Sequence, residues 1–148
     1  MENTKKPVWF ITGCSTGFGR ELAKLILSKG WNAVITARKT DKISDIAEGY
    51  KDSDLVLELD VNNKLQVAST IAKAQANFGK IDVLVNNAGY GYFSSIEEGE
   101  EEKIRAQFET NFFGLVNMIQ GVLPGMRQKR HGYIINFSSI GGNCGFSD

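Results

Sequence analysis

A cluster of glycines and small polar residues near the N-terminus has the spacing of a phosphate-binding loop. The segment Thr12–Gly19 reads TGCSTGFG, follows the apolar run Val8–Thr12 and precedes an amphipathic helical pattern. Gly13 permits a sharp turn, Gly17 lets the backbone approach a pyrophosphate, and Gly19 permits close packing of the helix on the strand. Such a helix directs free backbone N–H groups at the anion. The residues predicted to bind a dinucleotide here are Gly13, Ser15, Thr16, Gly17, Phe18 and Gly19.

Two other interpretations of this glycine-rich segment are a plain tight turn between strand and helix, and the phosphate loop of a nucleoside triphosphatase. A glycine pattern alone is weak evidence, but a position between a strand and a helix is what a dinucleotide site requires. No Gly-Lys-Ser/Thr follows the glycines, which disfavours the triphosphatase. We therefore prefer the dinucleotide site.

The end of the next apolar run, Ala33–Ala37, bears on which dinucleotide is bound. A site for NAD usually has an acidic residue at this place to hold the ribose 2′-hydroxyl, but here Arg38 and Lys39 follow the run. Arginine is planar and charged and suits bidentate contact with a phosphate, and the missing acid removes repulsion against that phosphate. We predict NADP rather than NAD, with Ser15 as a further donor to the 2′-phosphate. The alternative is that Arg38 and Lys39 are ordinary solvated loop residues.

Polar residues also follow the later apolar runs. Asp60 and Val61 come after the third run, Asn86–Gly89 after the fourth, and Ser138–Ser139 after the fifth. Ligands of open parallel sheets bind outside the carboxyl ends of the strands, so all three segments are well placed for a site. The alternatives are that the asparagines only form a turn and that the serine hydroxyls only solvate a loop.

Asn111 is the polar member of an otherwise apolar helical pattern. The spacing of Ile104, Phe108, Asn111, Leu115, Ile119 and Val122 predicts that the asparagine lies on the buried stripe of a long helix. A buried amide without partners costs about 1–3 kcal/mol, so we expect a hydrogen-bonding partner for it. That partner is backbone, ordered water or a catalytic side chain, and the structural alternative is a bridge to a neighbouring strand.

Strands and helices alternate along the chain. The predicted strands are Val8–Thr12, Ala33–Ala37, Leu55–Leu59, Val83–Asn86 and Tyr133–Phe137. Their nearly continuous apolar character is typical of parallel strands covered on both faces. Helical patterns fall before Gly30, before Gly79 and from about Glu100 to about Gln128, the last with a bend expected near Pro124. The fold class predicted is α/β, one doubly wound parallel sheet of the Rossmann type over residues 1–148.

The ordered motifs resemble the short-chain dehydrogenase/reductase family. The glycine spacing is G-x-x-x-G-x-G, and it is followed by Asp60-Val61, by the segment NNAG at 86–89, by Asn111 in TNFFG and by Ser139 in NFSSIGG. These motifs span residues 12 to 142, nearly the whole chain. The resemblance implies an NADP-dependent oxidoreductase that interconverts a carbonyl and an alcohol by hydride transfer.

The resemblance also implies a role for each motif. Asp60 and Val61 lie near the adenine. Asn87, Ala88 and Gly89 support the cofactor pocket. Ser139 polarises the substrate oxygen as a catalytic residue, and Asn111 has a water-mediated part in a proton relay. No residue is predicted to bind a metal ion.

The acid/base pair of the family has no counterpart in this sequence. Family members have a tyrosine about thirteen residues after the serine, with a lysine four residues later, and that tyrosine would fall at position 152. None of the four tyrosines is followed by lysine at the fourth position. We therefore expect a fragment, truncated after the fifth strand and inactive by itself. The alternatives are a non-catalytic dinucleotide-binding module and, less favoured because of Arg38 and the NNAG segment, a methyltransferase of the Rossmann type.

Composition sets the remaining expectations. The 148 residues carry 17 basic and 17 acidic side chains, so zero formal net charge favours neither a nucleic-acid nor a membrane partner. The acidic run Glu97–Glu102 is interpreted as the solvated first turn of a helix. Two cysteines without metal-binding spacing, and no apolar segment of membrane-spanning length, are typical of a cytoplasmic protein. The resemblance adds a homo-oligomer of the full-length form as a further expectation.

Overall fold

The computed structural model describes residues 6–50 and 52–140, and its centre is a five-stranded sheet. All neighbouring strands are parallel, in the order β3-β2-β1-β4-β5. The order reverses between β1 and β4, which is where open sheets of this kind form a crevice for a ligand. The strands are β1 (Val8–Ile11), β2 (Asn32–Ala37), β3 (Asp54–Glu58), β4 (Val83–Asn86) and β5 (Tyr133–Asn136). The predicted doubly wound α/β fold is confirmed.

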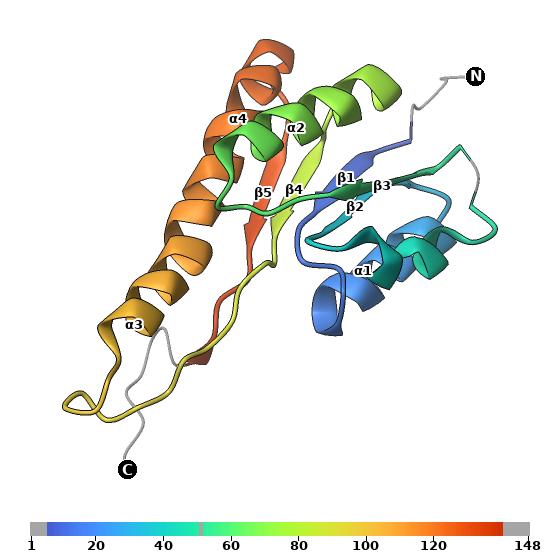
Figure 1. Cartoon of the computed structure of the whole chain (residues 1–148). Coiled ribbons are helices and arrows are strands. Elements are labelled where there is room, and N and C mark those ends of the chain that lie inside the picture. The colour runs from blue at the N-terminus through green and yellow to red at the C-terminus, as the bar shows by residue number, and fades with distance from the viewer. Residues whose placement is uncertain (1–5, 51, 141–148) are drawn as a thin grey trace, which may run out of the picture.

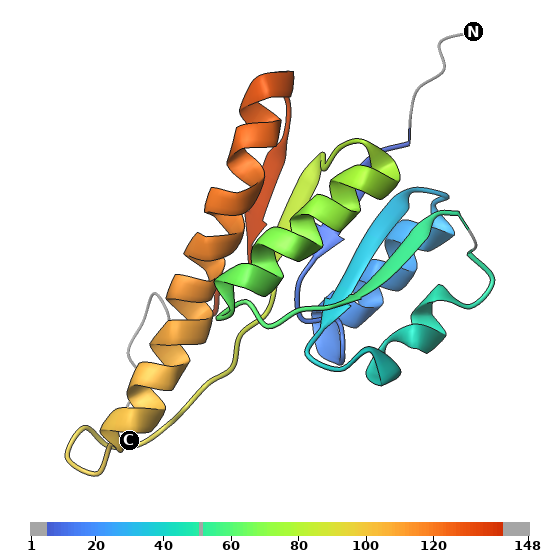
Figure 2. The same ribbon diagram turned by 45° about the horizontal axis from the view of Figure 1, so that its top comes forward.

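Helices cover both faces of the sheet (Figure 1). On one face lie α1 (Gly17–Ser28) and two short 3₁₀ turns at Thr40–Lys42 and Ser44–Ala47. On the other face α2 (Lys64–Phe78) and α4 (Leu115–Lys129) pack side by side (Figure 2). None of the helices in the described part of the chain has the length and apolar content needed to cross a membrane.

Each face of the sheet has its own apolar core. The α1 face buries Ile11, Ile35 and Val85 against Ile26 and Leu27 of the helix. The opposite face buries one cluster from β1, β2 and β4 and from α2 and α4, which includes Phe10, Val34, Leu84, Ile71, Met118 and Val122. Burial on both faces explains why β1, β2 and β4 read as nearly continuous apolar runs.

The third predicted helix is present but is not one regular α-helix. It consists of α3 (Glu101–Phe108), a π-helical turn at Glu109–Gly114 and α4. Pro124 lies inside α4. The sequence pattern missed the π-helical turn, because a constant helical period was assumed through Asn111.

The predicted burial of Asn111 is wrong, since its side chain is exposed. The residues of this helix that are buried are Gly114, Met118, Val122 and Met126. The π-helical turn contains one residue more per turn than an α-helix, so it rotates the helix before α4 begins. Asn111 consequently faces the loop after β4 instead of the sheet, and the predicted polar partner is in that loop.

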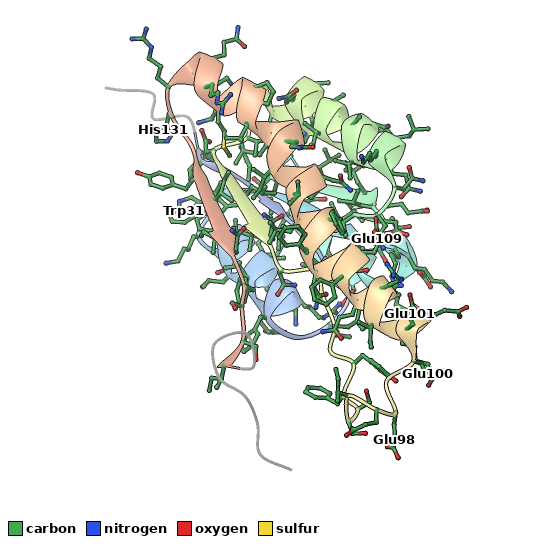
Figure 3. All side chains as sticks on the ribbon, turned by 90° about the vertical axis from the view of Figure 1, so that its left-hand side faces the viewer. Trp31, Glu98, Glu100, Glu101, Glu109 and His131 are labelled. Carbon is green, nitrogen blue, oxygen red and sulfur yellow. The ribbon has the colours of Figure 1, made fainter. Side chains whose placement is uncertain are left out.

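The acidic run is divided between a loop and a helix start. Figure 3 shows Glu98 in the loop before α3, with Glu100 and Glu101 at the helix start. Glu100 is the N-cap residue, and Glu101 and Glu102 occupy the first turn. The interpretation as a helix start therefore holds for Glu100–Glu102, where carboxylates complement the partial positive charge of the helix. Glu97 and Glu98 lie in the preceding turn.

Candidate dinucleotide-binding site

A cleft of about 690 Å³ lies at the carboxyl ends of β1, β2 and β4, beside the π-helical turn. It is situated at the reversal of strand order that the fold predicts for a ligand. The predicted site residues that line it are Gly13, Ser15, Thr16, Arg38, Asp60, Val61, Asn87, Ala88 and Gly89. Segments separated by up to about a hundred positions in the sequence thus meet in one cleft. The described structure does not place Gly17, Phe18, Gly19, Lys39, Asn111 or Ser139 in its wall.

Two of the three loop glycines are required by the space around them. Gly13 has φ +71°, and a Cβ there would lie 2.8 Å from the Cα of Ala88. A Cβ on Gly19 would lie 2.4 Å from Nδ2 of Asn87 and 2.7 Å from the carbonyl oxygen of Gly13. The close packing expected of Gly19 is therefore against the neighbouring loops. A Cβ on Gly17 would meet no atom within 4 Å, although its φ of +62° favours glycine.

Thr12 and Asn87 join the glycine loop to the segment after β4. The hydroxyl of Thr12 accepts the backbone N–H groups of Asn87 and Ala88, each at 3.0 Å, and lies 3.2 Å from the carbonyl oxygen of Val85, to which it donates. The Asn87 amide donates to the carbonyl oxygens of Thr12 and Gly13, both at 3.0 Å. Thr12 is 1% exposed, so these bonds are shielded from water. Asn87 is thus a support of the pocket and not only a turn residue.

The start of α1 leaves its backbone donors available. Its N-cap residue Thr16 makes no side-chain capping bond, and the first turn holds no acidic residue. The first N–H groups of a helix need a partner, and an anion is one that also suits the helix dipole. Phe18 in this turn is 77% exposed and stacks on Phe137, with ring centroids 5.9 Å apart. It contacts Phe137, the residue after β5, and does not line the cleft.

Arg38 brings a positive charge to the cleft. It follows the last residue of β2, is exposed, and its guanidinium makes no hydrogen bond or ion pair with any described residue. A cationic side chain held at a cleft without a partner is suited to an anionic ligand. The neighbouring Lys39 is also exposed but lies outside the cleft wall.

Asp60 and Val61 form the part of the cleft wall that follows β3. The Asp60 carboxylate accepts the N–H of Asn62 at 3.0 Å, and its own N–H donates to Gln66 at 2.8 Å. The Asn62 amide then donates to the hydroxyl of Thr110 in the π-helical turn at 3.0 Å. This chain of bonds fixes the loop after β3 against the long helix, at the edge of the cleft.

Asn111 holds the backbone of the loop after β4. Its Oδ1 accepts the N–H of Tyr90 at 3.0 Å, and its Nδ2 donates to the carbonyl oxygen of the same residue at 2.7 Å. Both polar ends of the amide are therefore satisfied by one peptide segment. Tyr90 lines the cleft, so Asn111 shapes the site through its neighbour, without being in the cleft wall.

Ser138 and Ser139 lie just past the end of β5 and are both exposed. This places them at the carboxyl edge of the sheet, as expected, although neither is in the cleft wall. At the same edge the Asn86 amide donates to Oδ1 of Asn136 at 2.9 Å, joining β4 to β5. The remainder of the NFSSIGG motif, after residue 140, is outside the described residues.

Several cleft residues were not predicted from the sequence. They include Asn62, Ala106, Glu109 and Thr110. Thr12 belongs to the predicted loop segment, but its bonds to the segment after β4 were not predicted. Thr110 and Glu109 belong to the helix, and no local pattern shows that a helix residue reaches the loop after β3. Among the described residues, no group of three or more His, Cys, Asp or Glu side chains could hold a metal ion.

Comparison with protein families and curated sequences places this arrangement among known enzymes. A family model described as short chain dehydrogenase matches residues 7–148. The oxidoreductase BOA17 of Botryotinia fuckeliana is 36% identical over 139 residues, which cover 93% of this chain and 51% of the relative. The 3-ketodihydrosphingosine reductase of Bacteroides thetaiotaomicron is 40% identical over 136 residues, covering 91% of this chain and 48% of the relative. The chain spans about half the length of these relatives.

Solved structures have the same fold, and this chain again covers little more than half of each of them. A short-chain dehydrogenase from Streptomyces avermitilis has a TM-score of 0.92 and 35% identity, covering 99% of this chain and 54% of the other. The closed form of serine dehydrogenase complexed with NADP⁺ has a TM-score of 0.89 and 30% identity, covering 95% and 57%. A structure of ElxO with NADP bound has a TM-score of 0.88 and 32% identity, covering 95% and 58%.

Proposed function

The chain belongs to the short-chain dehydrogenase family, and from this premise we propose that it forms the dinucleotide-binding part of an NADP-dependent oxidoreductase that interconverts a carbonyl and an alcohol. The observation that carries the proposal is the cleft, in which the glycine loop, Arg38 and Asp60 meet at the carboxyl edge of the sheet. Two structural relatives are described with NADP bound, which supports the choice of cofactor.

The residues present fit a dinucleotide. The uncapped start of α1 offers backbone N–H groups to a pyrophosphate, and Gly13 and Gly17 have the positive φ that the loop before it requires. Asp60, Val61 and the segment Asn87–Gly89 line the same cleft and would hold the remainder of the molecule. A Cβ on Gly13 would force the loop away from Ala88, so this loop depends on glycine to form the cleft.

Arg38 supports NADP over NAD. It is the charged residue of the cleft wall at the end of β2, where a site for NAD usually carries an acid that holds the ribose 2′-hydroxyl. Its guanidinium would pair with a 2′-phosphate, and Ser15 in the same wall would donate a further hydrogen bond. Lys39 is proposed only to add positive charge nearby.

Ser139 and Asn111 are proposed as the catalytic residues. NADPH supplies a hydride when it is bound. Ser139, at the carboxyl edge of the sheet, would hold the substrate oxygen by a hydrogen bond. Asn111 would keep the loop at Tyr90 in place and contribute to the relay that moves a proton to or from that oxygen. Positioned proton transfer contributes about 10²–10⁴-fold in rate, so the activity depends strongly on a group that performs it.

A second candidate function is a dinucleotide-binding module without catalytic activity. It is favoured by one observation: the described structure places neither Ser139 nor Asn111 in the wall of the cleft. Such a module would bind NADPH in the same cleft through Arg38, but it would oxidise none of the bound nucleotide.

The two functions separate in one experiment on the full-length protein. NADPH binding is measured by titration, and NADPH oxidation is followed at 340 nm with a panel of aldehydes and ketones. The enzyme predicts both binding and oxidation, with oxidation reduced about 10²-fold or more in Ser139→Ala while NADPH binding is unchanged. Binding of NADPH without its oxidation by any carbonyl compound of the panel favours the module. If NADPH does not bind, both proposals are wrong.

A further inference from the structure

The loop from Asn87 to Glu100 connects β4 to α3 and has no strand or helix of its own. A connection of this length is held in one conformation only if other parts of the molecule bind its backbone. Gly89 and Tyr90 of this loop form part of the cleft wall. What holds the loop therefore decides the shape of the site.

Two side-chain amides of the long helix bind alternate residues of the loop. Asn111 binds the N–H and the carbonyl oxygen of Tyr90, and Gln107 accepts the N–H of Tyr92 at 2.8 Å. Gln107 and Asn111 are four positions apart, about one turn of helix, so they present their amides on neighbouring parts of one face. In an extended segment the N–H groups of alternate residues point the same way. The helix thus holds the loop at two successive points.

Tyr92 also ties the loop to the start of α3. Its hydroxyl oxygen accepts the N–H of Glu100 at 3.1 Å, and Nζ of Lys103 lies 5.7 Å from its ring centroid. Tyr92 is half-buried, whereas the neighbouring Gly91 and Phe93 are exposed. Tyr92 therefore donates a hydrogen bond to the helix through its backbone N–H, and its hydroxyl joins the loop to the N-cap residue of α3.

The tied segments are two walls of the cleft. One wall is Gly89 and Tyr90, and the other is Ala106, Glu109 and Thr110 of the long helix. We infer that Gln107 is a positioning residue: with Tyr92 it forms a clamp that sets the distance between these walls and thereby the affinity for the dinucleotide. This inference rests on the proposed function for the identity of the ligand.

Three substitutions in the 148-residue chain test the clamp. Gln107→Leu keeps the size of the side chain but cannot accept the N–H of Tyr92, whereas Gln107→Glu retains an acceptor oxygen. Gln120→Leu is the matched control, because Gln120 is exposed on α4 and outside the cleft wall. The measurements are amide hydrogen exchange at Tyr90 and Tyr92, and the Kd for NADPH.

The clamp predicts faster exchange of the Tyr92 amide and a higher Kd for NADPH in Gln107→Leu, each by about 3- to 10-fold, which corresponds to the loss of one hydrogen bond. Gln107→Glu is expected to remain close to the unchanged chain in both measurements. The Tyr90 amide stays protected because Asn111 still holds it. If Gln107→Leu fails to fold, Tyr92→Phe provides a second test, with faster exchange predicted at Glu100 and a weaker affinity for NADPH.

Three results would overturn the inference or its premise. Unchanged exchange at Tyr92 in Gln107→Leu means that no clamp exists. Faster exchange with an unchanged Kd means that the clamp does not position the cleft. If the unchanged chain does not bind NADPH, the proposed function is wrong, and the exchange measurements still decide whether Gln107 holds Tyr92.

Discussion

At the scale of single residues, the structure shows that Thr12, the first residue of the glycine-rich segment, has a buried hydroxyl that binds the segment after β4. The Thr12 hydroxyl accepts the backbone N–H groups of Asn87 and Ala88 and donates to the carbonyl oxygen of Val85 in β4. Its neighbour Gly13 was predicted from the spacing of the glycines, and its positive φ confirms the expected turn. A short motif predicts the conformation of its own backbone but not the long-range bonds that hold it in place.

Replacement of Thr12 tests this bond network. We expect Thr12→Val, which keeps the shape but removes the hydroxyl, to lower the free energy of unfolding by about 1–3 kcal/mol, because the N–H groups of Asn87 and Ala88 lose their acceptor. Urea denaturation measures the change. Thr12→Ser retains the hydroxyl and is expected to cost less. Equal losses in the two variants would contradict the network.

Cys14 is predicted to be unreactive although it lies in the glycine loop. Its side chain is 0% exposed, and burial raises the pKa of the thiol to about 12. Only the thiolate reacts, so we expect very slow labelling by iodoacetamide at pH 8 and fast labelling after unfolding. The measurement uses a Cys144→Ser background, since Cys144 lies outside the described residues. Fast labelling of the folded chain would contradict the buried thiol.

The same pKa shift makes stability depend on pH. The unfolded thiol ionises above about pH 8.5, whereas the folded thiol stays protonated to about pH 12. The unfolded state therefore binds fewer protons between these values, and the contribution of Cys14 to stability falls as the pH rises through this window. We expect the loss between pH 8 and pH 11 to be smaller in Cys14→Ala than in the unchanged chain.

At the scale of elements, the strands were more predictable than the long helix. Three of the five predicted strands differ from the observed ones by one residue at one end, and Val83–Asn86 agrees at both ends. Leu55–Leu59 is displaced by one residue at both ends from the observed Asp54–Glu58. The agreement arises because parallel strands of such a sheet are short apolar runs between turns. The helix pattern failed at Asn111, where the π-helical turn changes the period. Gly114 ends this turn beside Val61, a contact that no local sequence pattern reveals.

We expect the packing of the long helix against Val61 to require glycine at position 114. A Cβ there would lie 2.5 Å from Cγ2 and 3.1 Å from Cβ of the buried Val61. Although Ala favours helices over Gly by up to about 1 kcal/mol, we expect Gly114→Ala to destabilise the fold by about 1–3 kcal/mol through this clash. Gly125→Ala is the matched control, because only the mobile end of the Gln75 side chain approaches within 4 Å there. Stability is measured by thermal denaturation, and a lower melting temperature for Gly125→Ala than for Gly114→Ala would contradict the predicted clash.

At the scale of the whole molecule, β5 is an edge strand with an apolar face. Tyr133, Ile135 and Phe137 are 63%, 39% and 43% exposed on the face that α1 covers elsewhere, and Phe18 stacks on Phe137 at its end. Such an edge promotes association between chains. The sequence predicted a strand at Tyr133–Phe137 because of its apolar character.

We therefore expect the 148-residue chain to self-associate as its concentration rises. Ile135→Thr combined with Phe137→Thr should weaken this association, as measured by sedimentation velocity. Leu65→Thr is the control, because Leu65 is 83% exposed on α2, away from β5. A monomer at all concentrations, or equal effects of the two changes, would show that the β5 face is not the cause.

The most direct test of the central claim is a calorimetric titration of the 148-residue chain with NADPH and with NADH. We predict tighter binding of NADPH, and a loss of about 10- to 100-fold in NADPH affinity in Arg38→Ala with NADH affinity unchanged, as expected for a charge-assisted bond to the 2′-phosphate. Arg127→Ala, which removes an exposed charge on α4, should change neither affinity. Equal affinities for the two nucleotides, or an NADPH affinity that survives Arg38→Ala, would contradict the account.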